Sequence, residues 1–224
     1  MIFLRFADGC RHYLEHTKQI SVKDSREIHM CLDGTGPRPS ERTLNRVYHV
    51  AYPGLQVVQK RLKKDSMFDT DVVREFYSRD HNKTMHGRGN LICIAYPARV
   101  REVKKIATGS SRKPGYGKLP ACDALVELEP VTGIFRIESD IPLKAGDWVT
   151  VHRMNIIEKI SKQFADSSMT YLRKLGLDKK RVFPEKSYKY LTGLRYSSIK
   201  RHLSGDFLDI RTTKRQNSSC CCDI

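Results

Sequence analysis

Two residues of the chain carry side chains that together suit metal binding or covalent chemistry. Cys93 opens the run Cys-Ile-Ala-Tyr-Pro, and His152 closes the run Gly-Asp-Trp-Val-Thr-Val-His. A thiolate is a soft, strongly donating ligand for iron, and a nearby imidazole or cationic group favours its formation. Taken singly, Cys93 reads as a small buried apolar residue and His152 as an ordinary core or surface histidine.

The same pair would also suit an enzyme with Cys93 as nucleophile and His152 as base. The sequence offers no signal for an oxyanion hole or a substrate pocket beside them. It also shows no Gly-rich phosphate loop, paired catalytic carboxylates or Ser-His-Asp order that stands out. We therefore expect a binding protein and not an enzyme.

Short β-rich runs must position the two residues. Partly alternating runs, separated by turns, read LICIAYPARVREV, DALVELEPVTGIFRIESDI and GDWVTVHRMNIIEKI. Such runs are typical of a small sheet or barrel. A terminal helix follows, with Gly176 at its C-cap. Its predicted apolar stripe comprises Phe164, Ser168, Tyr171, Leu172 and Leu175.

The chain divides into four segments by composition. Residues 1–80 are expected to form a mostly helical segment of unknown role, with a capped helix start at Ser40. Polar and glycine residues at 81–90 predict a linker. Residues 91–177 hold the β-rich runs. Residues 178–224 form a basic C-terminal extension whose tail is expected to be disordered.

The motifs of residues 91–177, taken in order, resemble the HypC/HupF hydrogenase-assembly chaperones. Members of that family begin with Met-Cys, two small or apolar residues, a variable residue and Pro. They later carry Gly-Asp-aromatic-Val-x-Val-His, then Ile-Glu-Lys and a terminal helix. Cys93 to Pro97, Gly146 to His152 and residues 157–159 match these motifs in the same order. The resemblance implies a small OB-like β-barrel with a terminal helix, so the expected fold class is α+β.

The resemblance also implies a function in hydrogenase maturation, together with a HypD-like maturation protein. Through the Cys93 thiolate, with His152 beside it, the chain would carry a transient iron fragment with cyanide and carbon monoxide ligands. The recipient would be the large-subunit precursor of a nickel-iron hydrogenase. Ile94, Tyr96 and Pro97 would contact the partner protein. No permanently bound cofactor is expected.

The chain departs from the family at the cysteine itself. In the family this cysteine follows the initiator Met and lies at a free chain end, whereas Ile92 and the residues before it precede Cys93 here. The run from Ala107 to Cys122 is longer than the expected turn, and the extension past Leu177 has no counterpart. Access to Cys93 would then require processing of the chain or a linker that loops away from the thiol.

Charge raises an alternative function. The 224 residues include 41 Lys and Arg against 25 Asp and Glu, a formal net charge of +16. The excess is spread as +5, +5 and +6 over residues 1–90, 91–177 and 178–224. Such a spread favours a role in solubility or in binding an acidic partner over specific binding in a nucleic-acid groove. The alternative is an OB-like single-stranded nucleic-acid-binding protein. Its contact residues would be Arg112, Lys113, Tyr116 and Lys118, next to Arg99, Arg101, Lys104 and Lys105.

The seven cysteines are irregularly spaced and no secretory signal precedes them, so we expect reduced thiols and a cytoplasmic location. No stretch approaches the roughly 18 apolar residues of a membrane span. At the C-terminal cluster Cys220–Cys222, Asp223 argues against prenylation of Cys221. A further set has zinc-binding residue types at spacings that match no regular site. It comprises Cys10, His12, His16, His29 and Cys31.

Overall fold

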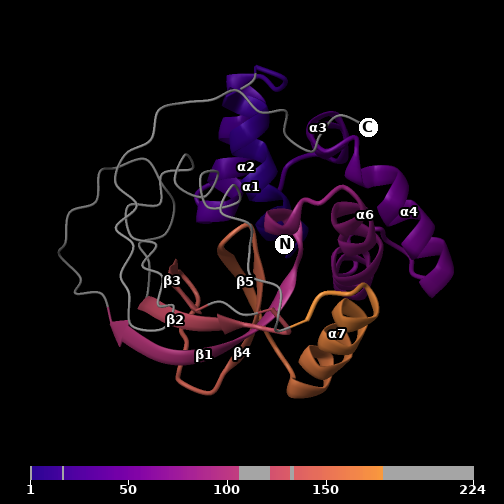
Figure 1. Cartoon of the computed structure of the whole chain (residues 1–224). Helices are drawn as coiled ribbons and strands as arrows, with labels where there is room; N and C mark the ends of the chain where they lie inside the picture. The colour runs from indigo at the N-terminus through magenta and orange to yellow at the C-terminus, as the bar shows by residue number, and fades with distance from the viewer. Residues whose placement is uncertain (1, 17, 106–121, 132–133, 179–224) are drawn as a thin grey trace. The chain divides into compact units, whose positions relative to one another are not determined.

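The computed structural model describes residues 2–16, 18–105, 122–131 and 134–178 (Figure 1). These residues fall into two compact units, within residues 2–81 and 82–178. Helices and one antiparallel sheet give a mixed α+β protein, as the sequence predicts at this coarse level. Of the helices in the described ranges, none combines the length and apolar character that a bilayer crossing requires.

The described part of the first unit is helical. Its elements are α1 (Ile2–His16), α2 (Val22–Asp33), α3 (Glu41–Val47), α4 (Ala51–Leu62), α5 (Thr70–Glu75) and the π-helical turn η1 (Phe76–His81). Ser21 and Ser40 cap α2 and α3, each accepting the N–H of the third helical residue, Asp24 and Thr43 respectively. Such caps satisfy N–H groups that have no partner within the helix. The helix start predicted at Ser40 is therefore confirmed.

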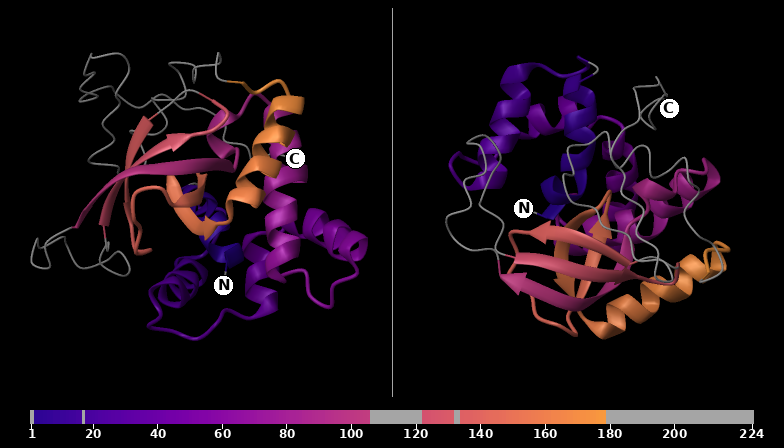
Figure 2. Two further views of the ribbon diagram at one scale, coloured as in Figure 1. Left: turned by 90° about the horizontal axis from the view of Figure 1, so that it is seen from below. Right: turned by 60° about the vertical axis from the view of Figure 1, so that its left-hand side comes forward.

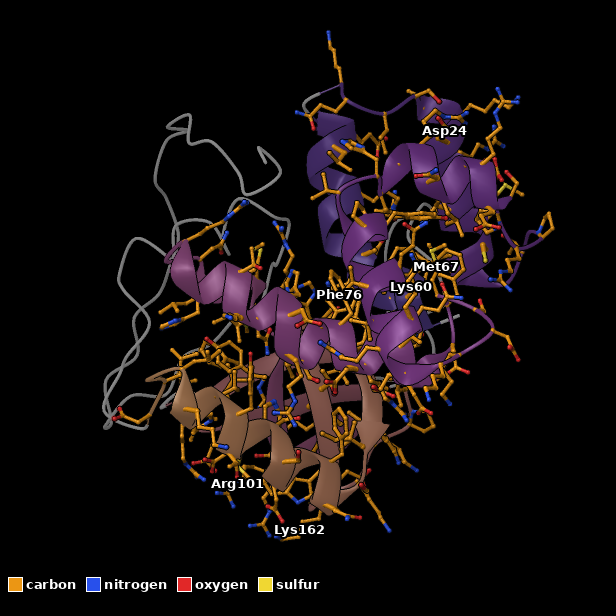
Figure 3. All side chains as sticks on the ribbon, turned by 90° about the vertical axis from the view of Figure 1, so that its right-hand side faces the viewer. Asp24, Lys60, Met67, Phe76, Arg101 and Lys162 are labelled. Atoms are coloured by element: carbon orange, nitrogen blue, oxygen red, sulfur yellow. The ribbon has the colours of Figure 1, made fainter. Side chains whose placement is uncertain are left out.

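Aromatic rings fill much of the core of the first unit. Phe6 and Tyr77 stack with ring centroids 4.3 Å apart. Leu55 and Val58 of α4 are both fully buried. Gly54 precedes Leu55, and the ring of Phe76 (labelled in Figure 3) occupies the space that a Cβ at Gly54 would need. Close approach of this ring therefore requires glycine at position 54.

A bidentate ion pair joins α2 to α3. The Asp24 carboxylate, labelled in Figure 3, accepts from Arg46 Nε at 3.0 Å and from a second guanidinium nitrogen. Asp24 is also in the first turn of α2, where a negative charge interacts favourably with the helix dipole. The hydrogen bond from Arg46 outweighs burial and holds the pKa of the Asp24 carboxyl below its ordinary value.

The second unit contains the sheet. Its elements are α6 (Asn82–Gly87), the 3₁₀ turn η2 (Leu91–Cys93), β1 (Tyr96–Lys105), β2 (Cys122–Leu128), β3 (Ile134–Ser139), β4 (Trp148–His152), β5 (Asn155–Ile160) and α7 (Lys162–Lys174). The strands lie in the order β3-β2-β1-β4-β5 and every neighbouring pair is antiparallel. The sheet curls, as Figure 2 shows, and brings β3 near β5. No strand ladder joins these two strands in the described ranges, so the sheet is an open half-barrel.

Strand β1 carries a bulge at Arg101. Val100 pairs with Val126 of β2, whereas Glu102 pairs with Leu125, so Arg101 is an extra residue with no partner position on β2. Arg101 and Glu102 are both exposed as a result. A bulge of this kind increases local twist and bends the strand, which suits a curled sheet.

Helix α7 packs against β1 and β4 along one side of the sheet (Figure 2). Its buried residues are Ala165, Ser168, Met169 and Leu172. The predicted stripe is thus right at Ser168 and Leu172, whereas Phe164, Tyr171 and Leu175 are half-buried. Gly176, at φ +81, follows the last helical turn as expected of a residue at a C-cap.

Residues 81–90, expected as a linker, are mostly helical. The helical run continues from α5 through η1 into α6, which ends at Gly87. Polar residues here serve as caps and core contacts, since Asn82 is fully buried and Asn90 caps η2. At Asn82 and Asn90 the polar composition that predicted a break therefore reflects hydrogen bonding to backbone groups.

Candidate functional site

Cys93 is the last residue of η2, at the entrance to the sheet. Its N–H lies 3.3 Å from both the carbonyl oxygen and the side-chain oxygen of Asn90. The residue is only 4% exposed. The thiol of the described structure is therefore a buried group, and not the accessible one that a free chain end would provide.

His152 ends β4 and lies against the backbone of Cys93. Its Nε2 is 3.0 Å from the Cys93 carbonyl oxygen, and the ring is buried. The fold thus joins two residues 59 positions apart that the sequence singles out as a pair. This contact with the carbonyl helps to fix the position of the cysteine backbone.

The sulfur contact comes from Arg153. Its guanidinium Nη1 donates to Cys93 Sγ at 3.3 Å, and the residue is 5% exposed. Arg153 and Met154 form the two-residue turn between β4 and β5, with φ of +48 and +62. Two-residue hairpins favour such left-handed angles, but usually with Asn or Gly at both positions. Two bulky residues there are held by their buried surroundings.

Arg153 is not among the residues that the sequence predicts for the site. A charged residue directly after a strand ordinarily reads as a solvent-exposed turn residue. In the sequence, the three residues between Val149–His152 and Ile156–Ile157 include Asn155, an ordinary turn residue. No sequence signal therefore singles out Arg153.

A polar frame holds the segment around Cys93. The Asn82 side chain donates to the Ala95 carbonyl at 3.0 Å and accepts the Ala95 N–H at 2.8 Å. The Tyr96 hydroxyl donates to the Leu91 carbonyl at 3.1 Å. Burial, and secondly the electrostatic influence of the nearby Cys93 side chain, raises the pKa of the Tyr96 hydroxyl above its ordinary value. The hydroxyl therefore stays protonated and able to donate.

The residues expected to contact a partner lie in the core. Ile94 and Tyr96 are both buried, and Pro97 is buried within β1 opposite Thr150. A partner contact through these three residues stays a prediction and would require the segment to open. Tyr96 and Pro97 lie on β1, the central strand of the curled sheet, and Ile94 lies just before it.

The site supplies only part of a metal's coordination shell. In the described ranges no three His, Cys, Asp or Glu side chains gather where a metal ion would fit. A thiolate from Cys93 and an imidazole from His152 would provide two ligands at most. A metal held here would have to bring further ligands of its own or share those of another protein.

The residues next to β4 have structural roles. Asp147 accepts the Lys144 N–H at 2.9 Å in the turn before β4 and pairs with Lys159 at 2.8 Å. Burial would raise the pKa of the Asp147 carboxyl, but Lys159 and the Lys144 N–H outweigh it and lower that pKa. Trp148 is half-buried. Asp147 therefore stabilises the turn that leads into β4.

The other predicted sites are only partly described. Arg112, Lys113, Tyr116, Lys118 and the Cys220–Cys222 cluster lie outside the described residues, and so does the extension from residue 179. On the sheet, Arg101 pairs with Glu127 and Arg136 pairs with Asp123. These two arginines are thus neutralised locally by acidic side chains on the neighbouring strand.

The site rests on sequence motifs and geometry alone. Comparison with protein-family models, with curated proteins and with solved structures gave no match to this chain.

Proposed function

We propose that residues 82–178 are an OB-like domain of the HypC/HupF type that carries an iron fragment during assembly of a nickel-iron hydrogenase. The observation that supports this proposal is the 3.0 Å contact between His152 and the Cys93 carbonyl. These are the two residues that the family resemblance assigns to iron binding. Their separation of 59 positions makes the meeting a property of the fold and not of local sequence.

The incomplete ligand set fits a carrier better than a permanent metal centre. Structural and catalytic metal sites use three or four protein ligands, whereas the described residues offer Cys93 and His152. An iron ion that already carries cyanide and carbon monoxide needs few protein ligands, because its other positions are filled. A single thiolate can then hold the fragment and release it to a client with more ligands.

The buried thiol implies a step that opens the site. The side chains of Asn90, Asn82, His152 and Arg153 hold the short segment that contains Cys93. Such short segments open locally at a much lower free-energy cost than global unfolding. In this proposal a HypD-like protein binds the open form, loads iron onto Sγ, and the large-subunit precursor later accepts the fragment.

The test is anaerobic co-expression of the full chain with a HypD-like protein and the proteins that make the cyanide ligands. The purified chain should contain iron and show infrared bands of bound cyanide and carbon monoxide. Cys93→Ala should lose both signals. Cys122→Ala is the matched control, because Cys122 is a second buried cysteine of the same unit, and it should retain them. Iron and both bands on the Cys93→Ala chain would overturn the proposal.

A further inference from the structure

We propose that Arg153 selects the cargo by charge, so that the Cys93 site accepts iron carrying anionic ligands and rejects bare divalent cations. This inference rests on the proposed function and names the class of metal complex that the site takes. It begins from one contact, the 3.3 Å hydrogen bond from Arg153 Nη1 to Cys93 Sγ.

The turn geometry fixes the guanidinium at the sulfur. Arg153 and Met154 both have left-handed backbone angles and both are buried. Residues with long side chains adopt such angles only where the surroundings enforce them. The hairpin is anchored on either side by the pairing of His152 with Asn155. A flexible surface arginine would move away from an incoming cation. In this inference the paired hairpin instead keeps the Arg153 guanidinium at the site when the Cys93 segment opens.

Charge arithmetic separates the two kinds of cargo. A bare divalent cation bound to one thiolate keeps a net positive charge and would be repelled by the adjacent guanidinium. Ferrous iron with two cyanides, neutral carbon monoxide and one thiolate carries a single negative charge and would be attracted. Burial strengthens both effects, because charges interact more strongly away from water.

Hydrogen bonding adds to the same preference. A guanidinium has N–H donors in a planar fork that matches anionic acceptors. The nitrogen of a metal-bound cyanide accepts hydrogen bonds well, whereas the oxygen of carbon monoxide accepts them poorly. Arg153 would therefore also orient the cyanides toward the β4–β5 turn.

The test compares two probes on the full, metal-free chain under anaerobic conditions. One probe is ferrous iron alone, and the other is a preformed ferrous complex with two cyanides and carbon monoxide. The unsubstituted chain should bind the cyanide complex at least about tenfold more tightly than bare ferrous iron. Arg153→Met should lose that preference, because its affinity for the cyanide complex falls while its affinity for ferrous iron stays equal or rises. Arg153→Lys, which keeps the charge, should show a preference between those of the unsubstituted chain and Arg153→Met.

Each outcome separates the two proposals. Binding of neither probe to the unsubstituted chain overturns this inference, whereas the iron content and infrared bands of the co-expressed chain decide the proposed function separately. Binding of both probes, with an unchanged preference in Arg153→Met, overturns only the role of Arg153. Equal weakening of both probes in Arg153→Met would mean that the side chain merely supports the fold. The preference measured in the unsubstituted chain tests the inference even where a variant does not fold.

Discussion

The side-chain amide of Asn82 hydrogen-bonds both backbone groups of Ala95, donating to the carbonyl and accepting the N–H. A side chain from helix α6 thus provides the two hydrogen bonds that a neighbouring strand would otherwise give to the Ala95 backbone. Ala95 lies two residues after Cys93, so the amide determines the path of the segment that carries the thiol. All three residues are buried.

Replacing Asn82 by Leu should destabilise the chain by about 2–4 kcal/mol, because two buried backbone groups lose their partners. Leucine fills a similar volume, so the loss reports hydrogen bonding and not a cavity. Urea unfolding followed by circular dichroism measures it. Lys83→Ala, at the exposed next position of α6, should change stability by no more than about 0.5 kcal/mol. An Asn82→Leu variant as stable as the unsubstituted chain would show that the two hydrogen bonds to Ala95 do not stabilise the fold.

Cys93 should become reactive before Cys122 as urea is raised. Both thiols are buried, but Cys122 lies on β2 between two paired strands. Cys93 lies in a three-residue turn that can open locally. Brief maleimide labelling followed by peptide mass spectrometry should show Cys93 modified first, with half-buried Cys31 as the reference. Equal protection of both cysteines up to global unfolding would make Cys93 a core residue and count against a carrier.

Gly54→Ala should destabilise the chain although alanine is the better helix former by about 1 kcal/mol. The new Cβ meets the buried ring of Phe76, and overpacking of this kind costs about 1–3 kcal/mol. Gly87→Ala is the matched control, since no atom lies within 4 Å of a Cβ built there. The midpoint temperature of thermal unfolding should be lower in Gly54→Ala than in the unsubstituted chain, and equal or higher in Gly87→Ala. A stabilising Gly54→Ala would show that the ring has room to move.

Asp24→Asn should destabilise the chain at neutral pH and lose this effect in acid. Because folding lowers the pKa of Asp24, its contribution is complete above the ordinary value of about 3.9. It disappears as the pH falls through the lower folded-state value. We expect about 1 kcal/mol at pH 7 for this ion pair at a helix start.

The control for Asp24 is an exposed ion pair on another helix. Lys162 Nζ lies 2.6 Å from Asp166 on α7, and Lys162 (labelled in Figure 3) is 71% exposed. Asp166→Asn should therefore cost about 0.3–0.5 kcal/mol. Urea unfolding at several pH values distinguishes the two variants. A loss at Asp24 that is independent of pH would mean that shape, and not charge, matters there.

The sequence predicts the β-rich runs well because alternation of apolar and polar residues follows directly from strand geometry. The alternation is clearest on β2, where Ala124, Val126 and Leu128 are buried and the residues between them are half-buried. Closure of the sheet is different. Whether β3 pairs with β5 depends on strand tilt and register, which no single run encodes.

The sequence predicts the two central residues of the site, Cys93 and His152, but not the side chains that surround them. Cys93 and His152 belong to motifs, whereas the hydrogen bonds around Cys93 include those of Asn82 and Asn90, polar residues in a stretch that reads as a linker. Arg153 follows the same rule. Its charge predicts exposure, and only the three-dimensional turn shows that the guanidinium reaches sulfur.

Because Arg101 is an extra residue in the bulge of β1, the other side chains of the strand do not depend on it for the face on which they lie. Before it, Ala98 and Val100 lie opposite buried residues of β2, and after it Val103 does. The inward positions thus change from even to odd numbers at this residue. Deleting Arg101 would leave every other side chain of β1 on its present face and remove only an exposed ion pair with Glu127. Deleting any residue from Ala98 to Val100 would instead turn part of the strand inside out, so natural length variation in β1 should be confined to this point.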